Sequence, residues 1–266
     1  MTESASPVTE TPAPPLRVWL EREGALLRLR LARPNANLID VAMTEAIDAA
    51  LAAHAGDAHL RAVLLDHEGP HFSYGASIPE HMPEPCAAML AGMHRMVRRL
   101  VEFPLPVLVA IRGWCLGGGL ELACSGHILF AGPDARLGQP EIKLAVFAPA
   151  ASCLLPERIG QARADELLFT GDPVTAERAF AIGLVDHLAE DPELAALAWF
   201  DAHLAGHSAS ALRRAVHASR ADYAQRVSDK LEWVERFYLD DLMRLEDPIE
   251  GLTAFMAKRK PVWQDR

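Results

Sequence analysis

The sequence predicts an α/β protein in which a mixed core is followed by a helical C-terminal segment. Short apolar strands are expected at residues 60–65 and Val107–Ile111, and helix-compatible stretches separate them. Strands that alternate with helices favour parallel pairing in a covered sheet. Beyond residue 162 the chain becomes mainly helical. The clearest helices there span residues 176–182, 193–204 and 221–245, and a last helix opens at Asp247-Pro248.

The N-terminal part begins with a segment that lacks large apolar side chains. Residues 1–15 are rich in Thr, Ser and Pro, so we expect a disordered leader. Residues Leu16–Glu21 and Leu26–Leu31 alternate apolar and polar side chains on both sides of a turn, which predicts a β-hairpin. Asp40 is placed to cap a helix that carries apolar residues at four-residue spacing.

Methionines mark the helix that precedes the second apolar strand. Met89, Met93, Met96 and Leu100 recur at helical spacing, and Phe103-Pro104 ends the pattern. A flexible thioether fills gaps in a core well, so this stripe indicates a buried helix face rather than a binding surface.

Composition narrows the class of protein. The net charge of −10 argues against a general binder of nucleic acid or of an anionic membrane. No 18-residue apolar segment and no basic, apolar secretion signal is present in the sequence. The four cysteines have no zinc-ligand spacing, so we expect buried thiols, a cytoplasmic location and no metal site.

A triple glycine is the strongest local signal. The apolar run from Val107 ends in Gly117-Gly118-Gly119, and a helix-compatible segment with Glu121 follows at once. Glycines at a strand-to-helix turn admit close approach and leave the first helical N–H groups free for a developing oxyanion. A tight packing turn is the other interpretation of the glycines taken alone.

Five ordered motifs resemble the enoyl-CoA hydratase/isomerase (crotonase) superfamily over roughly residues 16–263. They are Phe72-Ser-Tyr-Gly-Ala-Ser77, Gly117-Gly-Gly-Leu-Glu121, Gly138-Gln-Pro-Glu141, Phe169-Thr-Gly-Asp-Pro-Val-Thr-Ala176 and Phe255-Met-Ala-Lys-Arg-Lys-Pro261. The resemblance implies a spiral core of ββα turns over residues 16–200 and a helical trimerisation subdomain over residues 201–266. It also implies an acyl-CoA thioester substrate, with no separate cofactor, and a homotrimer or homohexamer.

The same resemblance assigns the chemistry. The N–H groups of Ala76 and Gly118 are expected to form an oxyanion hole for the thioester oxygen. Glu121 and Glu141 match both catalytic glutamates of the hydratases, and two carboxyl groups around one water can divide the proton transfers. In the alternative interpretation, Glu121 is a solvated helix residue and Glu141 caps a turn. Apolar neighbours of Glu121 favour its burial instead.

Departures from the family pattern concern the substrate pocket. Tyr74 and Ser77 replace a usually small residue and a frequent aspartate, and with Gly117 they are expected to shape the CoA and acyl channel. Phe147 adds bulk, and Pro149 occupies the position of a glycine whose N–H holds the reacting water. These segments are similar to hydratases of cyclohexa-1,5-diene-1-carbonyl-CoA, which act in the breakdown of aromatic acids.

We expect the C-terminal tail to contact CoA. Lys258 and Lys260 resemble family cations that reach the CoA phosphates from a neighbouring subunit, although a cationic helix end alone also explains them. Other functions remain open at this point. They are a straight-chain enoyl-CoA hydratase of fatty-acid β-oxidation, an isomerase or hydrolase of the same superfamily, and a non-catalytic CoA-binding or RNA-binding protein.

Overall fold

The computed structural model describes residues 13–34 and 36–266, and within them two sheets carry the fold. The larger sheet has six strands in the order β1-β2-β3-β4-β6-β9. Within this sheet, only β1 and β2 pair antiparallel, as the hairpin pattern predicted. The other neighbouring strands of the sheet, from β2 to β9, pair in parallel. The smaller sheet has the order β5-β7-β8. The parallel core expected from the sequence is therefore confirmed.

The bounds of the elements follow. The strands are β1 (Leu16–Glu21), β2 (Leu26–Leu31), β3 (Ala62–His67), β4 (Val107–Ile111), β5 (Trp114–Leu116), β6 (Ile128–Ala131), β7 (Arg136–Gly138), β8 (Val174–Thr175) and β9 (His187–Leu188). The α-helices are α1 (Val41–His54), α2 (Pro83–Val101), α3 (Gly118–Ser125), α4 (Pro149–Ile159), α5 (Gln161–Thr170), α6 (Ala176–Ala181), α7 (Pro192–His203), α8 (Ala209–Asp240) and α9 (Glu246–Met256). Short 3-10 helices include η2 (Ile78–His81) and η3 (Pro140–Leu144).

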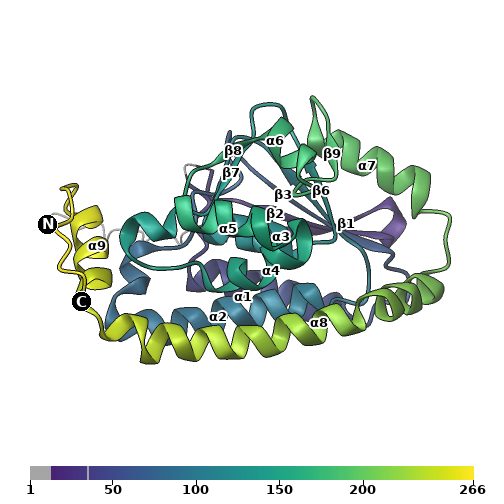
Figure 1. Ribbon diagram of the computed structural model, residues 1–266. Coiled ribbons are helices and arrows are strands. Elements are labelled where there is room, and N and C mark those ends of the chain that lie inside the picture. The colour runs from purple at the N-terminus through teal and green to yellow at the C-terminus, as the bar shows by residue number, and fades with distance from the viewer. Residues whose placement is uncertain (1–12, 35) are drawn as a thin grey trace, which may run out of the picture.

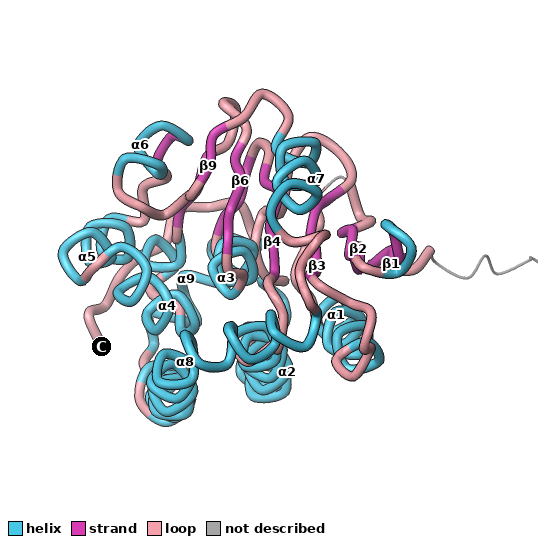
Figure 2. The backbone as a smooth tube through the Cα atoms, turned by 90° about the vertical axis from the view of Figure 1, so that its right-hand side faces the viewer, coloured by secondary structure: helices cyan, strands magenta, loops and turns pink. Residues whose placement is uncertain are grey.

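Helices cover both faces of the six-stranded sheet (Figures 1 and 2). Alternate residues of one strand serve the two faces: Leu27 packs in the core under α1 and α2, whereas Leu26 packs against Phe200 of α7. This two-sided burial explains why the central strand β4 is apolar throughout and β3 nearly so, whereas β1 and β2 alternate. The methionines of α2 lie in these buried clusters, which confirms the predicted core stripe.

Helix caps account for most of the predicted boundaries. The Asp40 side chain accepts from the N–H of Met43, and Thr175 caps α6 in the same way. The expected helix at residues 221–245 was misplaced, because α8 begins at Ala209, where Ser208 caps it, and ends at Asp240. Between Ala209 and residue 220 the helix is mostly exposed, so it has no apolar stripe from which the sequence could reveal it.

The strand expected at 60–65 is shifted by two residues. It continues through Asp66 and His67 because Asp66 pairs with Arg28 and Arg30 of β2. A buried carboxylate is tolerated in a strand when two guanidinium groups pair with it. The apolar pattern of the sequence predicted that the strand ends before this carboxylate.

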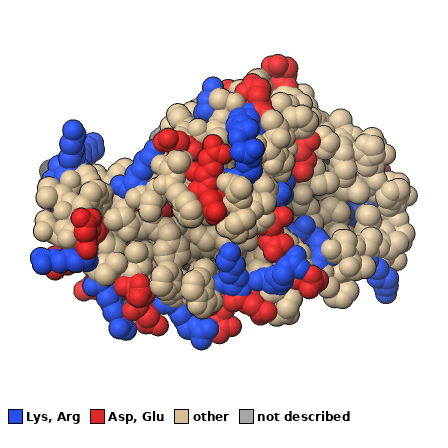
Figure 3. Space-filling model, in the orientation of Figure 1, with Lys and Arg blue, Asp and Glu red and all other residues tan. Residues whose placement is uncertain are grey.

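The C-terminal helices complete the molecule. Helix α8 runs along α2 and α4 on one side, and α9 lies beyond its end, against η2 and η3 (Figure 1). On the face shown in Figure 3, acidic and basic side chains are interspersed. Within the described residues, no helix has the length and apolar character needed to cross a membrane. The leader expected at residues 1–15 lies outside the described residues except for its last three positions.

Candidate active site

Three chain segments run side by side and bring their carboxyl ends to one place. Strand β5 pairs in parallel with β7, with Leu116 opposite Gly138, and Ser73 forms a parallel bridge to Cys115 on the other side of β5. The loop to Ala76 follows Ser73, the glycine turn follows β5, and the residues up to Glu141 follow β7. Carboxyl ends of parallel strands meet at one edge, so this order assembles the predicted site residues.

Gly117 is the closest point between the glycine turn and Glu141. Its φ of +51° favours glycine, and a Cβ placed on it would lie 2.6 Å from Glu141 Oε1. The Gly117 N–H donates to the Gly138 carbonyl at 2.9 Å, which joins the turn to the segment before Glu141. The carboxyl group of Glu141 therefore lies directly over the turn, and a side chain at this position would displace it.

The two residues expected to supply the oxyanion donors lie next to each other. A Cβ on Gly118 would be 3.2 Å from the backbone nitrogen of Ala76. Neither N–H donates to a backbone carbonyl outside the helices in the part of the chain that the structure describes. Ser73 Oγ accepts from the N–H of Gly75 at 3.0 Å and so shapes the loop that carries Ala76. The assignment of these two N–H groups to an oxyanion hole stays a prediction.

Glu121 lies in the first turn of α3 and is only 5% exposed, as its apolar neighbours predicted. Its Oε1 accepts from the N–H of Ala151 at 2.8 Å, in the first turn of α4. Burial raises the pKa of this carboxyl, whereas the Ala151 N–H and the charge of His94 act in the opposite direction. A helix N-terminus stabilises an anion, so α4 favours the carboxylate form of Glu121.

Glu141 has a different environment. In the amide orientation that satisfies both of its polar atoms, Gln139 donates to Oε1 and Oε2 of Glu141 at 3.1 and 3.0 Å. Burial, reinforced by the charge of Glu121, raises the pKa of Glu141 to about 8. Two neighbouring carboxyl groups do not both ionise readily, so the raised pKa of Glu141 favours its protonated form near neutral pH.

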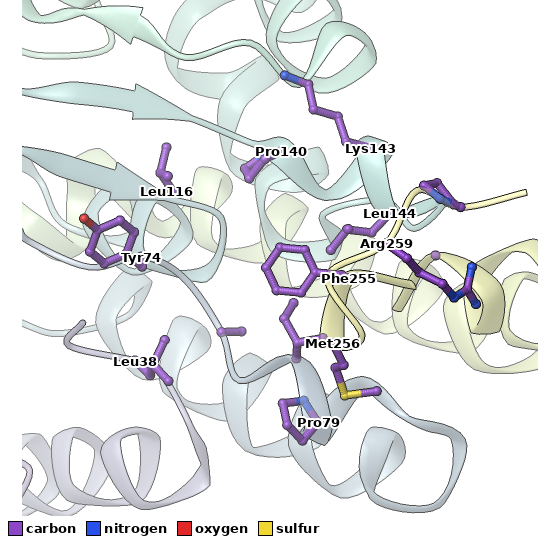
Figure 4. A pocket seen from close by; sticks show the side chains of 14 residues that line it. Leu38, Tyr74, Pro79, Leu116, Pro140, Lys143, Leu144, Phe255, Met256 and Arg259 are labelled. Carbon is purple, nitrogen blue, oxygen red and sulfur yellow. The ribbon is translucent and has the colours of Figure 1, made fainter. Parts of the chain in front are cut away.

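A cavity leads to Glu141, whereas Glu121 does not line it. The outer cavity has a volume of about 750 Å³, and an inner chamber of about 60 Å³ shares Tyr74, Ala76 and Pro140 with it. Gly117 and Glu141 line the inner chamber. In Figure 4, Tyr74 and Leu116 face Phe255 of α9 across the outer cavity. The cavity thus joins the surface near the C-terminal tail to the glycine turn.

The predicted substrate residues fall into two groups. Tyr74 and Gly117 line the cavities. Ser77, Phe147, Pro149, Lys258 and Lys260 do not line them. Phe147 packs against Phe237 and Tyr238 instead, with ring centroids 5.7 and 5.1 Å apart, and Pro149 begins α4. Their effect on substrate binding stays a prediction.

Some residues near the site were missed by the sequence argument. His94 is buried on α2 near Glu121, and its Nδ1 lies 2.5 Å from Glu235 Oε2 of α8. His81 lines the inner chamber, and Lys143 and Arg259 line the outer cavity. His81 in η2 and Lys143 in η3 lie close in the sequence to Ser77 and Glu141. His94 of α2 and Arg259, which follows α9, are brought to the site by long-range contacts.

Comparisons with known proteins agree with this geometry. Residues 21–266 match the enoyl-CoA hydratase/isomerase family. The chain is 58% identical over 252 residues to a cyclohexa-1,5-dienecarbonyl-CoA hydratase of Thauera aromatica, a similarity that covers 95% of this chain and 98% of that protein. It is 31% identical to a 2,3-dehydroadipyl-CoA hydratase of Escherichia coli, with 93% and 98% of the two chains covered.

Solved structures show the same fold. An enoyl-CoA hydratase from Mycobacterium avium subsp. paratuberculosis superposes with a TM-score of 0.83 at 25% identity, covering 96% of this chain and 100% of that one. An enoyl-CoA hydratase from Mycobacterium avium gives 0.83 at 26% identity, with 94% and 98% covered. The two-sheet core with a helical C-terminal segment is therefore the fold of these hydratases.

Proposed function

The chain belongs to the enoyl-CoA hydratase/isomerase (crotonase) family, and on this premise we propose that it is a hydratase of cyclohexa-1,5-diene-1-carbonyl-CoA. The proposal of this reaction type is supported by the neighbouring carboxyl groups of Glu121 and Glu141, which lie close to the glycine turn and the Ala76 loop. The ring substrate is supported by the 58% identity to the Thauera aromatica hydratase.

The backbone donors bind the thioester oxygen. With that oxygen between the N–H groups of Ala76 and Gly118, electron density from the carbon–carbon double bond moves onto it as water adds. The developing negative charge is stabilised by donors already in place, and removal of one such donor in other enzymes costs about 3–4 kcal/mol. This arrangement needs no charged residue at the oxygen.

The carboxyl groups divide the proton transfers. Glu121, held as a carboxylate by the N–H of Ala151, takes a proton from water while the water oxygen bonds to the β-carbon. Glu141 then gives its proton to carbon as the enolate collapses, and the proton on Glu121 restores it. One water is consumed, its hydroxyl group and a hydrogen are added to carbon, and both carboxyl groups return to their starting states. The reaction requires no cofactor besides the CoA moiety of the substrate.

Cations at the outer cavity are suited to the phosphates of CoA. Lys143 and Arg259 line this cavity, and the exposed Lys258 and Lys260 extend the positive charge along the tail. We propose that the tail binds CoA of the same subunit or of a neighbour within a homotrimer or homohexamer. A cytoplasmic location is supported by four free, buried cysteines.

The test of the substrate is a direct comparison of thioesters. The cyclic dienoyl-CoA is expected to exceed crotonyl-CoA in kcat/KM, because the Pro149 position lacks the N–H that usually holds water and a ring gains more orientation from a shaped pocket. Absorbance of the conjugated thioester and a mass increase of one water measure turnover. Equal or faster hydration of crotonyl-CoA would favour a straight-chain enoyl-CoA hydratase instead.

A further inference from the structure

His81 is one of three titratable side chains that line the inner chamber. It ends the 3-10 helix η2, which packs against α2 and α9, and it shares the chamber with Glu141 and Tyr74. The other residues that line the chamber are apolar or glycine. Tyr74 also lines the outer cavity. Within the described residues, His81 and Glu141 are thus the polar side chains that line the inner chamber but not the outer cavity.

A hydrogen bond to Ser77 fixes which ring nitrogen of His81 carries the proton. Nδ1 lies 2.9 Å from the backbone carbonyl oxygen of Ser77, and because a carbonyl oxygen only accepts, Nδ1 carries the N–H that donates. Burial lowers the pKa of His81 from its ordinary value of 6.5, although the Ser77 bond acts in the opposite direction. The ring is therefore neutral at pH 7, and Nε2 has a lone pair and no proton.

The inner chamber thus offers one hydrogen-bond acceptor and one donor to the group that enters it. Within residues 13–34 and 36–266, Nε2 of His81 has no hydrogen-bond partner, and unlike the unpaired Nε2 of His127 it is not sealed off by surrounding atoms. Glu141, whose pKa is raised to about 8, holds a proton at neutral pH and donates it. A hydroxyl group both accepts and donates, whereas a carbonyl oxygen only accepts and a methylene does neither. The lining therefore suits a hydroxyl group.

We propose that His81 recognises the hydroxyl group of the hydrated acyl moiety, which donates a hydrogen bond to Nε2 in the inner chamber. This inference rests on the proposed hydration and names a residue that determines specificity for its product. The chamber of about 60 Å³ suits the reacting end of an acyl group, and the outer cavity of about 750 Å³ leaves room for the rest of the thioester. His81 transfers no proton. It favours hydroxylated thioesters over unsubstituted ones.

The decisive variant is His81→Asn. The side-chain amide of asparagine can still donate to the Ser77 carbonyl, whereas nothing replaces Nε2. We expect the affinity for 3-hydroxybutyryl-CoA to fall about tenfold, and the affinity for butyryl-CoA, which lacks the hydroxyl group, to change by less than about twofold. The corresponding ring pair is 2-hydroxycyclohexanecarbonyl-CoA and cyclohexanecarbonyl-CoA. Isothermal titration calorimetry measures the dissociation constants of all four thioesters.

The ratio of the two affinities within a pair separates recognition of the hydroxyl group from a change in loop shape, which affects both ligands. His81→Phe removes both ring nitrogens and should lower the ratio in the same way, so it decides the question if His81→Asn does not fold. The matched control is His59→Asn, at an exposed residue that lines neither cavity, and it should keep the wild-type ratio. An unchanged ratio in the folded His81 variants, or an equal loss for both ligands, would overturn the proposal.

This measurement reads binding rather than turnover, so it distinguishes the two proposals. A protein that prefers hydroxylated thioesters through His81 but hydrates neither crotonyl-CoA nor the cyclic dienoyl-CoA would refute the proposed function alone. A protein that hydrates one of them while His81→Asn keeps the wild-type ratio would refute the assignment of His81 alone.

Discussion

At the scale of single residues, two chemically identical side chains are given different tasks by their surroundings. Glu121 receives an N–H from the first turn of α4, whereas Glu141 lies over Gly117 near a second carboxylate. Hydrogen bonds to the charged form favour ionisation, and burial beside a like charge opposes it. In the proposed mechanism, this asymmetry lets one group act as a base while the other still holds a proton.

Removal of either carboxyl group should abolish most of the activity and keep the fold. Glu121→Gln and Glu141→Gln are nearly isosteric, and each is expected to lower kcat by about 10²–10⁴-fold, the usual contribution of a proton-transfer group. Steady-state kinetics with circular dichroism measures both properties. Glu232→Gln, at a side chain that is 67% exposed on α8, is the control and should behave as wild type. Wild-type turnover in either site variant would remove that residue from the mechanism.

The pKa of Glu141 sets the alkaline limit of the reaction. As the proposed proton donor, this group must be protonated in the free enzyme, so kcat/KM for hydration should fall as pH rises through about 8. The folded protein also holds this proton from the ordinary value of 4.5 up to about 8, where the unfolded chain has released it. Rising pH therefore lowers the free energy of unfolding over this range.

Thermal unfolding at several pH values tests the same pKa. The difference in Tm between wild type and Glu141→Gln should shift in favour of the variant between pH 5 and pH 8. A constant difference would show that Glu141 titrates near its ordinary value in the folded protein.

At the scale of elements, glycines allow three parallel segments to approach closely enough to form one site. Gly119 on α3 faces Ser73, and a Cβ there would lie 2.5 Å from the Ser73 Cβ. Gly138 at the end of β7 is similarly close to the backbone of Pro173. The spacing between the Ala76 loop and α3 thus depends on the absence of side chains at particular positions.

Gly119→Ala should separate the two oxyanion donors. The added methyl group forces α3 away from the Ser73 loop, with an overpacking cost of about 1–3 kcal/mol in the free energy of unfolding. We expect a lower Tm together with a loss of kcat. Gly206→Ala is the matched control, because a Cβ there meets nothing within 4 Å. Equal effects of the two substitutions on kcat would mean that the donors do not depend on this contact.

At the scale of the whole molecule, the C-terminal helices form part of the site and also present apolar surface. Trp233 and Phe237 of α8 stack with centroids 5.2 Å apart and are 54% and 41% exposed. Phe169 of α5 is also exposed. Exposed aromatic residues of this size are common at protein interfaces, so they support the proposed homo-oligomer.

Light scattering during size-exclusion chromatography should give three or six times the chain mass of 29.0 kDa. The apolar surface buried between subunits drives this association, so the mass should persist in high salt. A mass of one chain at micromolar concentration would contradict the assembly and would leave Lys258 and Lys260 to act within their own subunit.

The sequence by itself determined the local elements and the identity of the catalytic motifs. Hydrophobic periodicity and caps specify the hairpin, the α2 core stripe and most helix ends, because these depend on neighbours along the chain. The apolar flanks of Glu121 likewise predicted its burial. Only the tertiary structure decided that Glu141 lies over Gly117, that the N–H of Ala151 in α4 donates to Glu121, and that His94 is paired with Glu235 of α8. These relations join segments far apart in the sequence, and the periodicity of one segment carries no information about which distant side chain packs against it.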